Sequence, residues 1–230
     1  ADNLVFYKET EFKDTEIGRI PKEWEVVRLS DVCTKITDRD HRTPAYVANG
    51  YPLIAPENFI GISDLDFINC RKISKDELER DRKRCDPIKG DLLLSRIGTI
   101  GLVRMVKTDQ AFSILHSIAL LRPNSLMIDG GFLLFWLQGP TIQLRLKLAV
   151  QSISTPDIGI DKIRTLPTVV PPLPEQQQIA SILSTIDEAI QKTDELIAKT
   201  ERLKKGMMQE LLTKGIGHKE FKDTEIGRIP

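Results

Sequence analysis

One segment restricts the fold of this chain more than any other, because it predicts a single α-helix of about ten turns. Across residues 175–214 the apolar side chains recur at spacings of three and four, the period of an amphipathic helix. At about 1.5 Å per residue such a helix is roughly 60 Å long, about twice the diameter of a small domain. Prolines within residues 171–174 and then Glu175 mark its start, and Lys214 and Gly215 mark its end.

The apolar stripe of this helix is too long to be covered by one globular domain, so we expect a second helix to pack against it. Thr193 and Thr200 interrupt the stripe at heptad spacing, which softens it and can set a register. The alternative is a helix that folds back along its own domain. The residues expected at the helix–helix interface are Ile179, Ile182, Leu183, Ile186, Ile190, Leu196, Ile197, Leu203, Met207 and Leu211.

The segment before the helix, residues 22–174, predicts a mixed α+β domain. Two β runs are separated by Gly98 and Gly101, and short helices are expected on either side of Pro140. Ser74 is expected to cap the start of a charged helix. The predicted fold class is therefore α+β, a mixed globular domain followed by one long coiled-coil-forming helix.

The overall charge is weak support for a nucleic-acid partner. Lysine and arginine number 33, and aspartate and glutamate also number 33, so the formal net charge is zero. Residues 22–174 carry 21 basic and 18 acidic side chains and are mildly basic. The densest apolar run, residues 132–137, is far too short to span a membrane, and no signal peptide is recognisable at the start.

The cysteines and tryptophans predict an ordinary reduced core. Cys33, Cys70 and Cys85 are odd in number, far apart and without CxxC spacing, which is typical of idle thiols in a cytoplasmic protein. Trp24 and Trp136 lie among aliphatic residues, so we expect both in the core.

The sequence holds no recognisable catalytic motif. Glycine-rich phosphate loops, HExxH and GxSxG are all absent, and the three histidines have no metal-ligand spacing. Acids stand near a lysine in residues 156–162, as in metal-dependent nucleases, but no acid-x-Lys follows at a plausible strand position. We therefore predict a non-catalytic protein with no cofactor and no metal.

Several polar segments have the composition of DNA contacts. The loop at residues 37–44 has no apolar residue before its closing proline, and arginine, histidine and threonine there suit base edges. A basic cluster at residues 80–84 and Arg96 before glycines suit phosphates, although a solvated helix face and an ordinary strand explain them equally simply. The candidate DNA-contact residues are Arg39, His41, Arg42, Thr43, Arg82, Lys83, Arg84, Arg96, Ser152, Ser154 and Thr155.

The sequence EFKDTEIGRIP occurs twice, at residues 11–21 and again at residues 220–230. An offset of 209 residues is too long for a solenoid repeat and suits a module of domain size. We therefore predict polar connectors at residues 1–21 and 215–230.

These segments together resemble one family, the specificity (S, HsdS) subunits of type I restriction-modification enzymes. The run PPLPEQQQIASIL with its long helix and KGMMQELLTKG resembles their central conserved region. KITDRDHRTPAYVANGYPLIAPENF, GDLLLSRIGTIGLVRMV and FKDTEIGRIPKEWEVVRL resemble parts of their target recognition domains. The family often has Gly-Thr-His where this chain has Arg39, Asp40 and His41.

The resemblance implies a non-catalytic partner in a larger complex. Members usually carry two recognition domains, each for one half of a bipartite double-stranded DNA site, held apart by two antiparallel helices. Modification subunits, which methylate adenine, dock on this frame, and restriction subunits join them. This chain shows one domain and one helix, so we expect a half-subunit form that pairs head to tail as a homodimer on a symmetric site. Two alternatives stay open: the recognition module of a fused restriction-methylation enzyme, and a coiled-coil adaptor that binds no DNA.

Overall fold

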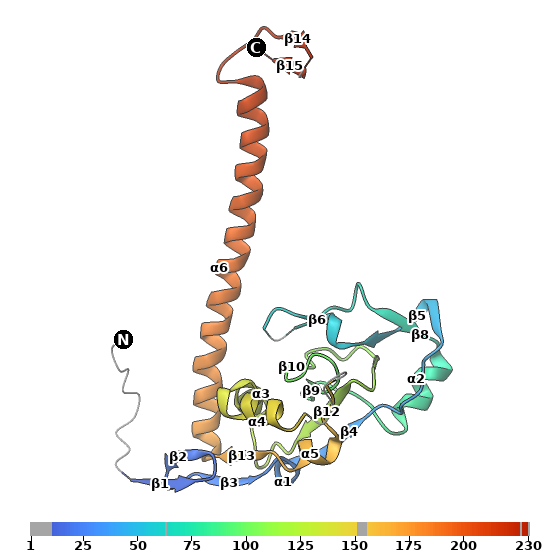
Figure 1. Ribbon diagram of the computed structural model, residues 1–230, viewed down its shortest axis with the longest axis vertical. Helices are drawn as coiled ribbons and strands as arrows, with labels where there is room; N and C mark the ends of the chain where they lie inside the picture. The colour runs from blue at the N-terminus through green and yellow to red at the C-terminus, as the bar shows by residue number, and fades with distance from the viewer. Residues whose placement is uncertain (1–10, 63, 151–155, 226, 230) are drawn as a thin grey trace. The chain divides into compact units, whose positions relative to one another are not determined.

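The computed structural model of the chain describes residues 11–62, 64–150, 156–225 and 227–229, and Figure 1 lays out its secondary structure. The chain divides into two compact units. The first ends at Ser184 and the second begins at Thr185, so the boundary lies within one long helix. The elements are β1 (Phe12–Thr15), β2 (Gly18–Pro21), β3 (Glu25–Arg28), α1 (Leu29–Val32), β4 (Cys33–Asp38), β5 (Tyr46–Ile54), a 3-10 turn (Pro56–Asn58), β6 (Phe59–Ile60), β7 (Asp64–Leu65), β8 (Arg71–Ile73), α2 (Lys75–Arg82), β9 (Leu92–Ser95), β10 (Val103–Met105), β11 (Ser113–Ile114), β12 (Ile118–Pro123), α3 (Gly130–Gln138), α4 (Pro140–Leu148), α5 (Ile160–Arg164), β13 (Pro167–Val170), α6 (Leu173–Lys214), β14 (Lys222–Thr224) and β15 (Gly227–Ile229).

A four-stranded antiparallel sheet in the order β10-β9-β12-β4 forms the centre of the first unit. Its side chains alternate between two cores: Leu92 and Leu94 join the core on one face, and Leu93 joins the core on the other. Leu121 and Leu120 divide in the same way on β12. Since both faces are buried, these strands read as continuous apolar runs rather than alternating ones.

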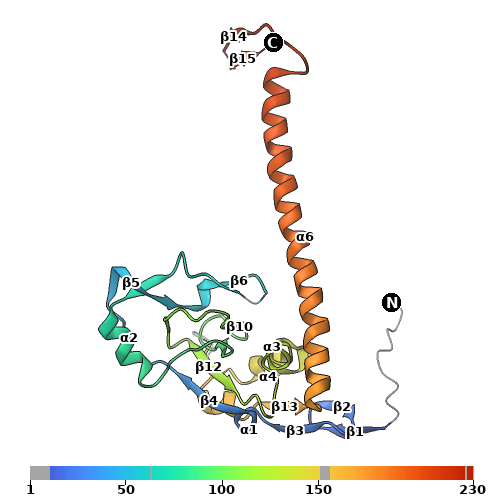
Figure 2. The same ribbon diagram turned by 180° about the vertical axis from the view of Figure 1, so that it is seen from behind.

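Different layers cover the two faces of this sheet. Helices α3 and α4 supply Phe132 and Leu146 to one core, and the three-stranded sheet β11-β5-β8 supplies Ile114 and Ile54 to the other. Figures 1 and 2 show α3 and α4 on one side of β9, β10 and β12, with β5 and β8 on the other. The predicted α+β class with a long following helix is confirmed.

Short sequence motifs correctly predicted where several elements begin or end. The side chain of Ser74 accepts a hydrogen bond from the Glu77 N–H at 3.2 Å and caps α2, as predicted. Between β9 and β10, Gly98 and Gly101 have φ of 75° and 91°, which favour glycine. A Cβ on Gly101 would also lie 2.5 Å from the Gln143 side chain, which would have to move, so the positive φ is the stronger requirement for glycine there.

The first turns of α6 are tied to the globular unit by Gln176. This side chain is fully buried, and its Oε1 accepts from the Asp129 N–H at 2.8 Å. Its Nε2 donates to the carbonyls of Met127 at 3.1 Å and Pro171 at 2.8 Å. One glutamine therefore satisfies three backbone groups where α6 meets the start of α3.

The two tryptophans pack against the first core, as expected, and each also makes a polar contact. Trp24 Nε1 donates to the Glu175 carboxylate at 3.0 Å, and Trp136 Nε1 donates to the Pro167 carbonyl at 3.2 Å. Partly buried indoles usually find such an acceptor. This hydrogen bond holds the side chain of Glu175, the first acidic residue of α6, beside Trp24.

The repeated segment folds as a β-hairpin in both copies, where the sequence had predicted connectors. Lys13 pairs with Ile20 and Asp14 with Arg19 in the first copy, and the second copy has the same register 209 residues later. In each copy the threonine hydroxyl, Thr15 or Thr224, donates to the facing glycine carbonyl at 2.7 Å. The first hairpin packs on the core through Ile20, which is 8% exposed.

Candidate nucleic-acid interface

Three loops meet at one edge of the central sheet because of its strand register. β12 pairs with both β4 and β9, so that Ala119 lies opposite Asp38 and Ile118 lies opposite Ser95. The chain leaves β4 and β9 and enters β12 at this same edge. The predicted loop at residues 37–44 begins two residues later than expected, because Thr37 and Asp38 belong to β4. Its remaining residues are brought beside Arg96 and the turn before β12.

Arg39 lies beneath this edge rather than on it, with only 1% of its surface exposed. Its Nε donates to Asp81 at 2.7 Å, its Nη2 donates to Glu77 at 2.6 Å and its Nη1 donates to the Arg42 carbonyl at 3.0 Å. All its donor groups are engaged, so Arg39 is removed from the predicted set of DNA-contacting side chains. Its position holds the loop in place.

Arg42 shares the same two carboxylates of α2. It donates to Glu77 through Nη1 and to Asp81 through Nη2, the latter at 2.6 Å. The Ser113 hydroxyl also donates to Asp81 at 2.7 Å. Two arginines and two carboxylates make a formally neutral, largely buried cluster, in which any one member is costly to remove alone.

A second cluster is centred on Asp38, which is 2% exposed. Arg96 donates to it through Nη2 at 2.8 Å, and also donates to Asp157 through Nη1 at 2.8 Å. Arg84 donates to Asp38 at 2.7 Å and to Asp40 at 3.0 Å. Because Arg96 is itself 3% exposed, it too is removed from the predicted surface contacts and positions its neighbours instead.

The remaining predicted residues present accessible side chains. His41 has 57% of its side chain exposed and Thr43 is exposed beside it on the same loop. Arg82, Lys83 and Arg84 are exposed at the end of α2, and the first two form no ion pair within the described part of the chain. Ser152, Ser154 and Thr155 lie outside the described residues.

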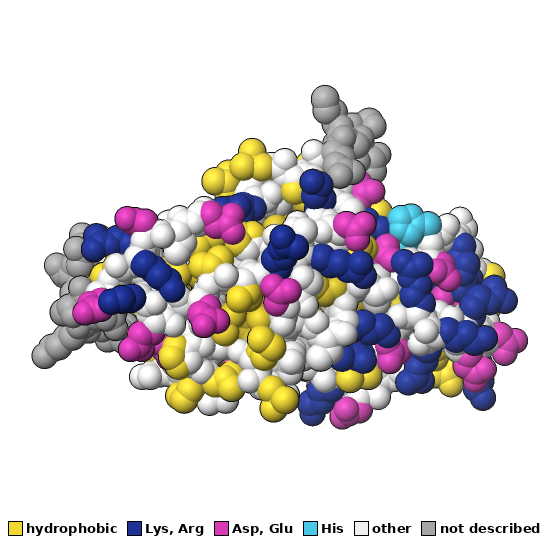
Figure 3. All heavy atoms as spheres, turned by 90° about the horizontal axis from the view of Figure 1, so that it is seen from below, with side chains coloured by type: hydrophobic (Ala, Val, Ile, Leu, Met, Phe, Trp, Pro, Cys, Tyr) yellow, Lys and Arg dark blue, Asp and Glu magenta, His cyan; other side chains and the backbone are white. Residues whose placement is uncertain are grey.

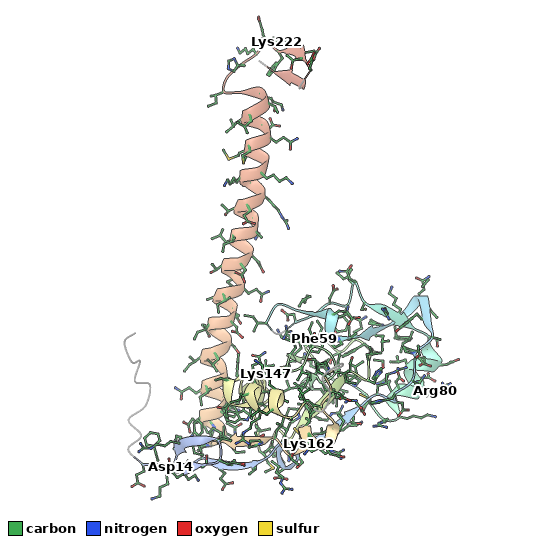
Figure 4. The ribbon with its side chains drawn as sticks, viewed as in Figure 1. Asp14, Phe59, Arg80, Lys147, Lys162 and Lys222 are labelled. Atoms are coloured by element: carbon green, nitrogen blue, oxygen red, sulfur yellow. The ribbon has the colours of Figure 1, made fainter. Side chains whose placement is uncertain are left out.

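The face that carries these residues is rich in cations. In Figure 3, dark-blue Lys and Arg side chains gather on the right, with acids among them, close to a cyan histidine. Arg80, labelled in Figure 4, lies on α2 at the edge of the first unit away from α3 and α4. The mixture of signs agrees with the alternating charges of the sequence around α2.

The second candidate surface is the apolar stripe of α6. Its first member, Ile179, packs partly against the core of the first unit, so the expected interface begins beyond it. From Thr185 to Lys214 nearly every side chain is exposed, including Leu196 and Leu203 at 63% each. Exposed apolar residues of α6 in the second unit are Ile186, Ile190, Leu196, Ile197, Leu203, Met207, Met208, Leu211 and Leu212.

The domain model described as the type I restriction modification DNA specificity domain matches residues 21–202, most of the chain. The chain belongs to the type I restriction-modification DNA specificity family. Among curated members, it is 36% identical over 99% of its length to a Methanocaldococcus jannaschii protein provisionally assigned as the MjaX specificity subunit. It is 31% identical over 99% of its length to the MjaVIII specificity subunit of that organism.

The chain spans about half the length of these curated relatives, 54% and 51% respectively. Solved chains from type I restriction-modification systems share its fold. A chain from a type I restriction-modification system has a TM-score of 0.59 at 22% identity, covering 83% of this chain and 46% of that one. The S subunit from M. genitalium has a TM-score of 0.57 at 17% identity, covering 82% and 45%.

Two other features are absent from the described residues. No cluster of three or more His, Cys, Asp or Glu side chains that could hold a metal ion is found there. Within the same residues, no helix has both the length and the apolar character needed to cross a membrane. The specificity-family fold thus presents a charged loop edge and an apolar helix as its two notable surfaces.

Proposed function

We propose that this chain reads one half of a bipartite DNA site as the specificity subunit of a type I restriction-modification complex. The observation that carries the proposal is made at the loop edge of the central sheet. There the side chains of His41 and Thr43 are exposed, and buried ion pairs support the loop that carries them. Reading a base sequence requires side chains held in a fixed geometry. The clusters around Asp81 and Asp38 provide such a support in a chain of the DNA specificity family.

The exposed residues divide into two kinds of contact. Arg82, Lys83 and Arg84 suit phosphates, which fix the register of the protein on the duplex. His41 and Thr43 suit base edges, to which their side chains can donate or from which they can accept. The near-neutral charge of the chain is compatible with this division if partner subunits supply part of the cationic channel.

Recognition in this proposal is separate from chemistry. A modification subunit docked on the chain would extrude the target adenine, because the reacting atom is inaccessible inside the stacked duplex. The chain itself would place that subunit on the site, and restriction subunits would join the assembly. It needs no metal or cofactor of its own for this role.

We further propose that α6 pairs with a second copy of itself in antiparallel orientation. Within α6, residues 185–198 carry four carboxylates and one lysine, whereas residues 199–214 carry five cations and two carboxylates. An antiparallel pair places each acidic half against a basic half, while a parallel pair would oppose like charges. The exposed stripe would then be buried, and a two-fold dimer would read a symmetric bipartite site.

Mapping methylated adenines across the source genome, with and without the gene, tests the proposal. Loss of methylation at a bipartite palindrome is the expected result. Loss at an asymmetric bipartite motif would instead indicate pairing with a different half-subunit. If every motif is unchanged and the chain shows no salt-dependent DNA binding in vitro, the proposal fails and the coiled-coil adaptor takes its place.

A further inference from the structure

A second histidine lies against His41 at the loop edge. His116 occupies the turn between β11 and β12, and its ring centroid is 4.9 Å from that of His41, with the ring planes 37° apart. This separation is ordinary aromatic packing. The two imidazoles come from loops 75 residues apart in the sequence, so only the sheet register brings them together.

The surroundings of His116 keep it neutral and decide which ring nitrogen carries the proton. Burial lowers its pKa below 6.5, and the positive charges of Arg96 and Arg39 lower it further, so the ring is unprotonated at neutral pH. Nδ1 is buried without a hydrogen-bond partner among the described residues. Since an orphaned buried N–H is rarer than an orphaned acceptor, the proton belongs on Nε2, which makes that nitrogen a donor.

His41 is oriented by two buried groups. Its Nε2 lies 2.8 Å from Arg96 Nη2 and 3.0 Å from Asp38 Oδ2. A guanidinium nitrogen can only donate, and Asp38 Oδ2 already accepts from that same Arg96 nitrogen at 2.8 Å. The His41 lone pair on Nε2 therefore accepts from Arg96, and the ring proton resides on Nδ1. The pair then offers two N–H donors.

We propose that His41 and His116 together read a guanine in the major groove of the half-site, an inference that rests on the proposed function. Guanine presents two adjacent acceptors, O6 and N7, on its major-groove edge. Adenine places a donor beside its N7, and cytosine presents a donor, so both would oppose one imidazole N–H with another donor. Thymine offers one acceptor beside a methyl group. Arg96 and Asp38 act here as positioning residues.

The test is selection from a double-stranded DNA library randomised over the length of a bipartite site, using the full chain with its modification subunits. The wild-type complex is expected to enrich guanine at one position of each half-site. His116→Ala should lower the preference for guanine at that position by about tenfold, leaving the other positions and the salt dependence unchanged. His116→Gln, which keeps a donor at similar reach, should retain part of the preference.

His41→Ala provides a second variant on the exposed loop and should relax the same position. His218→Ala, in the segment after α6, is the matched control and should change nothing. An unchanged guanine preference in His116→Ala overturns the inference, as does an equal loss at every position or relaxation of a different position by the two histidine variants. If the wild-type complex enriches no motif at all, the proposed function itself fails, which is a distinct result.

Discussion

At the scale of single residues, the loop edge depends on charges that are largely buried. Arg39 and Arg42 both donate to the same two carboxylates, Glu77 and Asp81, and Ser113 also donates to Asp81. Pairing four charges in a buried place adds little net stability, but removing one leaves another uncompensated. The cluster therefore fixes the conformation of the loop more than it stabilises the fold.

Asp81→Asn tests this role directly. The change keeps the shape of the side chain but leaves two guanidinium groups facing a neutral amide, so the free energy of unfolding should fall by about 3 kcal/mol. Denaturant unfolding followed by circular dichroism measures it. Glu79→Gln on the same helix is the control, because its ion pair with Lys75 at 3.7 Å is exposed and should matter by at most about 0.5 kcal/mol. Equal unfolding midpoints for the two variants would contradict the buried-cluster interpretation.

The cysteines allow a second test at this scale. Burial raises the pKa of the Cys33 and Cys85 thiols to about 12, and the carboxylate of Asp91 adds to the effect at Cys33. Both thiols therefore stay protonated and unreactive at neutral pH. Burial also raises the pKa of the Cys70 thiol, but by less, so Cys70 should be alkylated first. Mass spectrometry after iodoacetamide treatment measures the order. Rapid alkylation of Cys85 in the native protein would contradict its burial.

The residue types at the loop edge were predictable from the sequence, but their burial was not. The loop around Arg39 is polar throughout, which is typical of a solvated segment. The carboxylates that bury Arg39 come from Glu77 and Asp81, about forty residues later. Their spacing of four residues indicates a shared helix face, but no feature of the neighbouring sequence predicts that this face is buried. His116 was missed for the same reason, because its partner His41 lies on a loop 75 residues earlier in the sequence.

At the scale of elements, the junction between the globular unit and α6 rests on one glutamine. The PPLPEQ run ends on Gln176, whose amide is bonded to three backbone groups. Ala180 follows one turn later, and a Cβ added to Gly131 would lie 3.2 Å from its Cβ. The small residues let α6 and α3 approach closely, and the glutamine satisfies the polar groups trapped there.

Gln176→Ala should therefore destabilise the first unit by about 2–3 kcal/mol, because two buried carbonyls and one buried N–H lose their partners. Gln177→Ala, at the next position and exposed, is the matched control and should have almost no effect. Thermal unfolding of both variants gives the comparison. If the two melt together, the buried glutamine is not what secures the junction.

Periodic elements were the easiest to predict and short paired strands the hardest. The helix predicted over residues 175–214 is observed as Leu173–Lys214, and the helices on either side of Pro140 are also found. The pairing of β5 with β8 and β11 joins segments that no local pattern connects. The repeated EFKDTEIGRIP is short and polar, which predicts connectors, and cross-strand pairing folds each copy into a hairpin that no local pattern predicts.

At the scale of the whole molecule, the duplicated hairpin shows that the same residues fold alike in different surroundings. The first copy packs Ile20 into a core, and in the second copy Lys222 and Asp223 are exposed. The common register indicates that local pairing, including the threonine hydroxyl bond to the facing carbonyl, determines the hairpin. The two copies of the hairpin lie before the globular domain and after α6, so in the proposed dimer each would lie at one end of the unit formed by that domain and helix.

The long helix supports the last prediction, which concerns assembly. Leu196→Glu, in the middle of the stripe, should convert dimers to monomers in analytical ultracentrifugation, because burial would desolvate the new carboxylate. The globular unit should keep its unfolding midpoint, since Leu196 is 63% exposed in the single chain. Glu195→Gln beside it is a control that should leave the dimer intact.

The dependence of dimer affinity on salt concentration then distinguishes an antiparallel from a parallel helix pair. In an antiparallel pair the acidic residues 185–198 face the basic residues 199–214, so raising the salt concentration should weaken the dimer. A parallel pair opposes like charges and should be strengthened by the same change. Replacing Lys204 and Lys205 with Glu in one chain should weaken its self-association, and a partner carrying Asp194→Lys and Glu195→Lys should restore pairing. Dimers that tighten with salt would overturn the antiparallel arrangement.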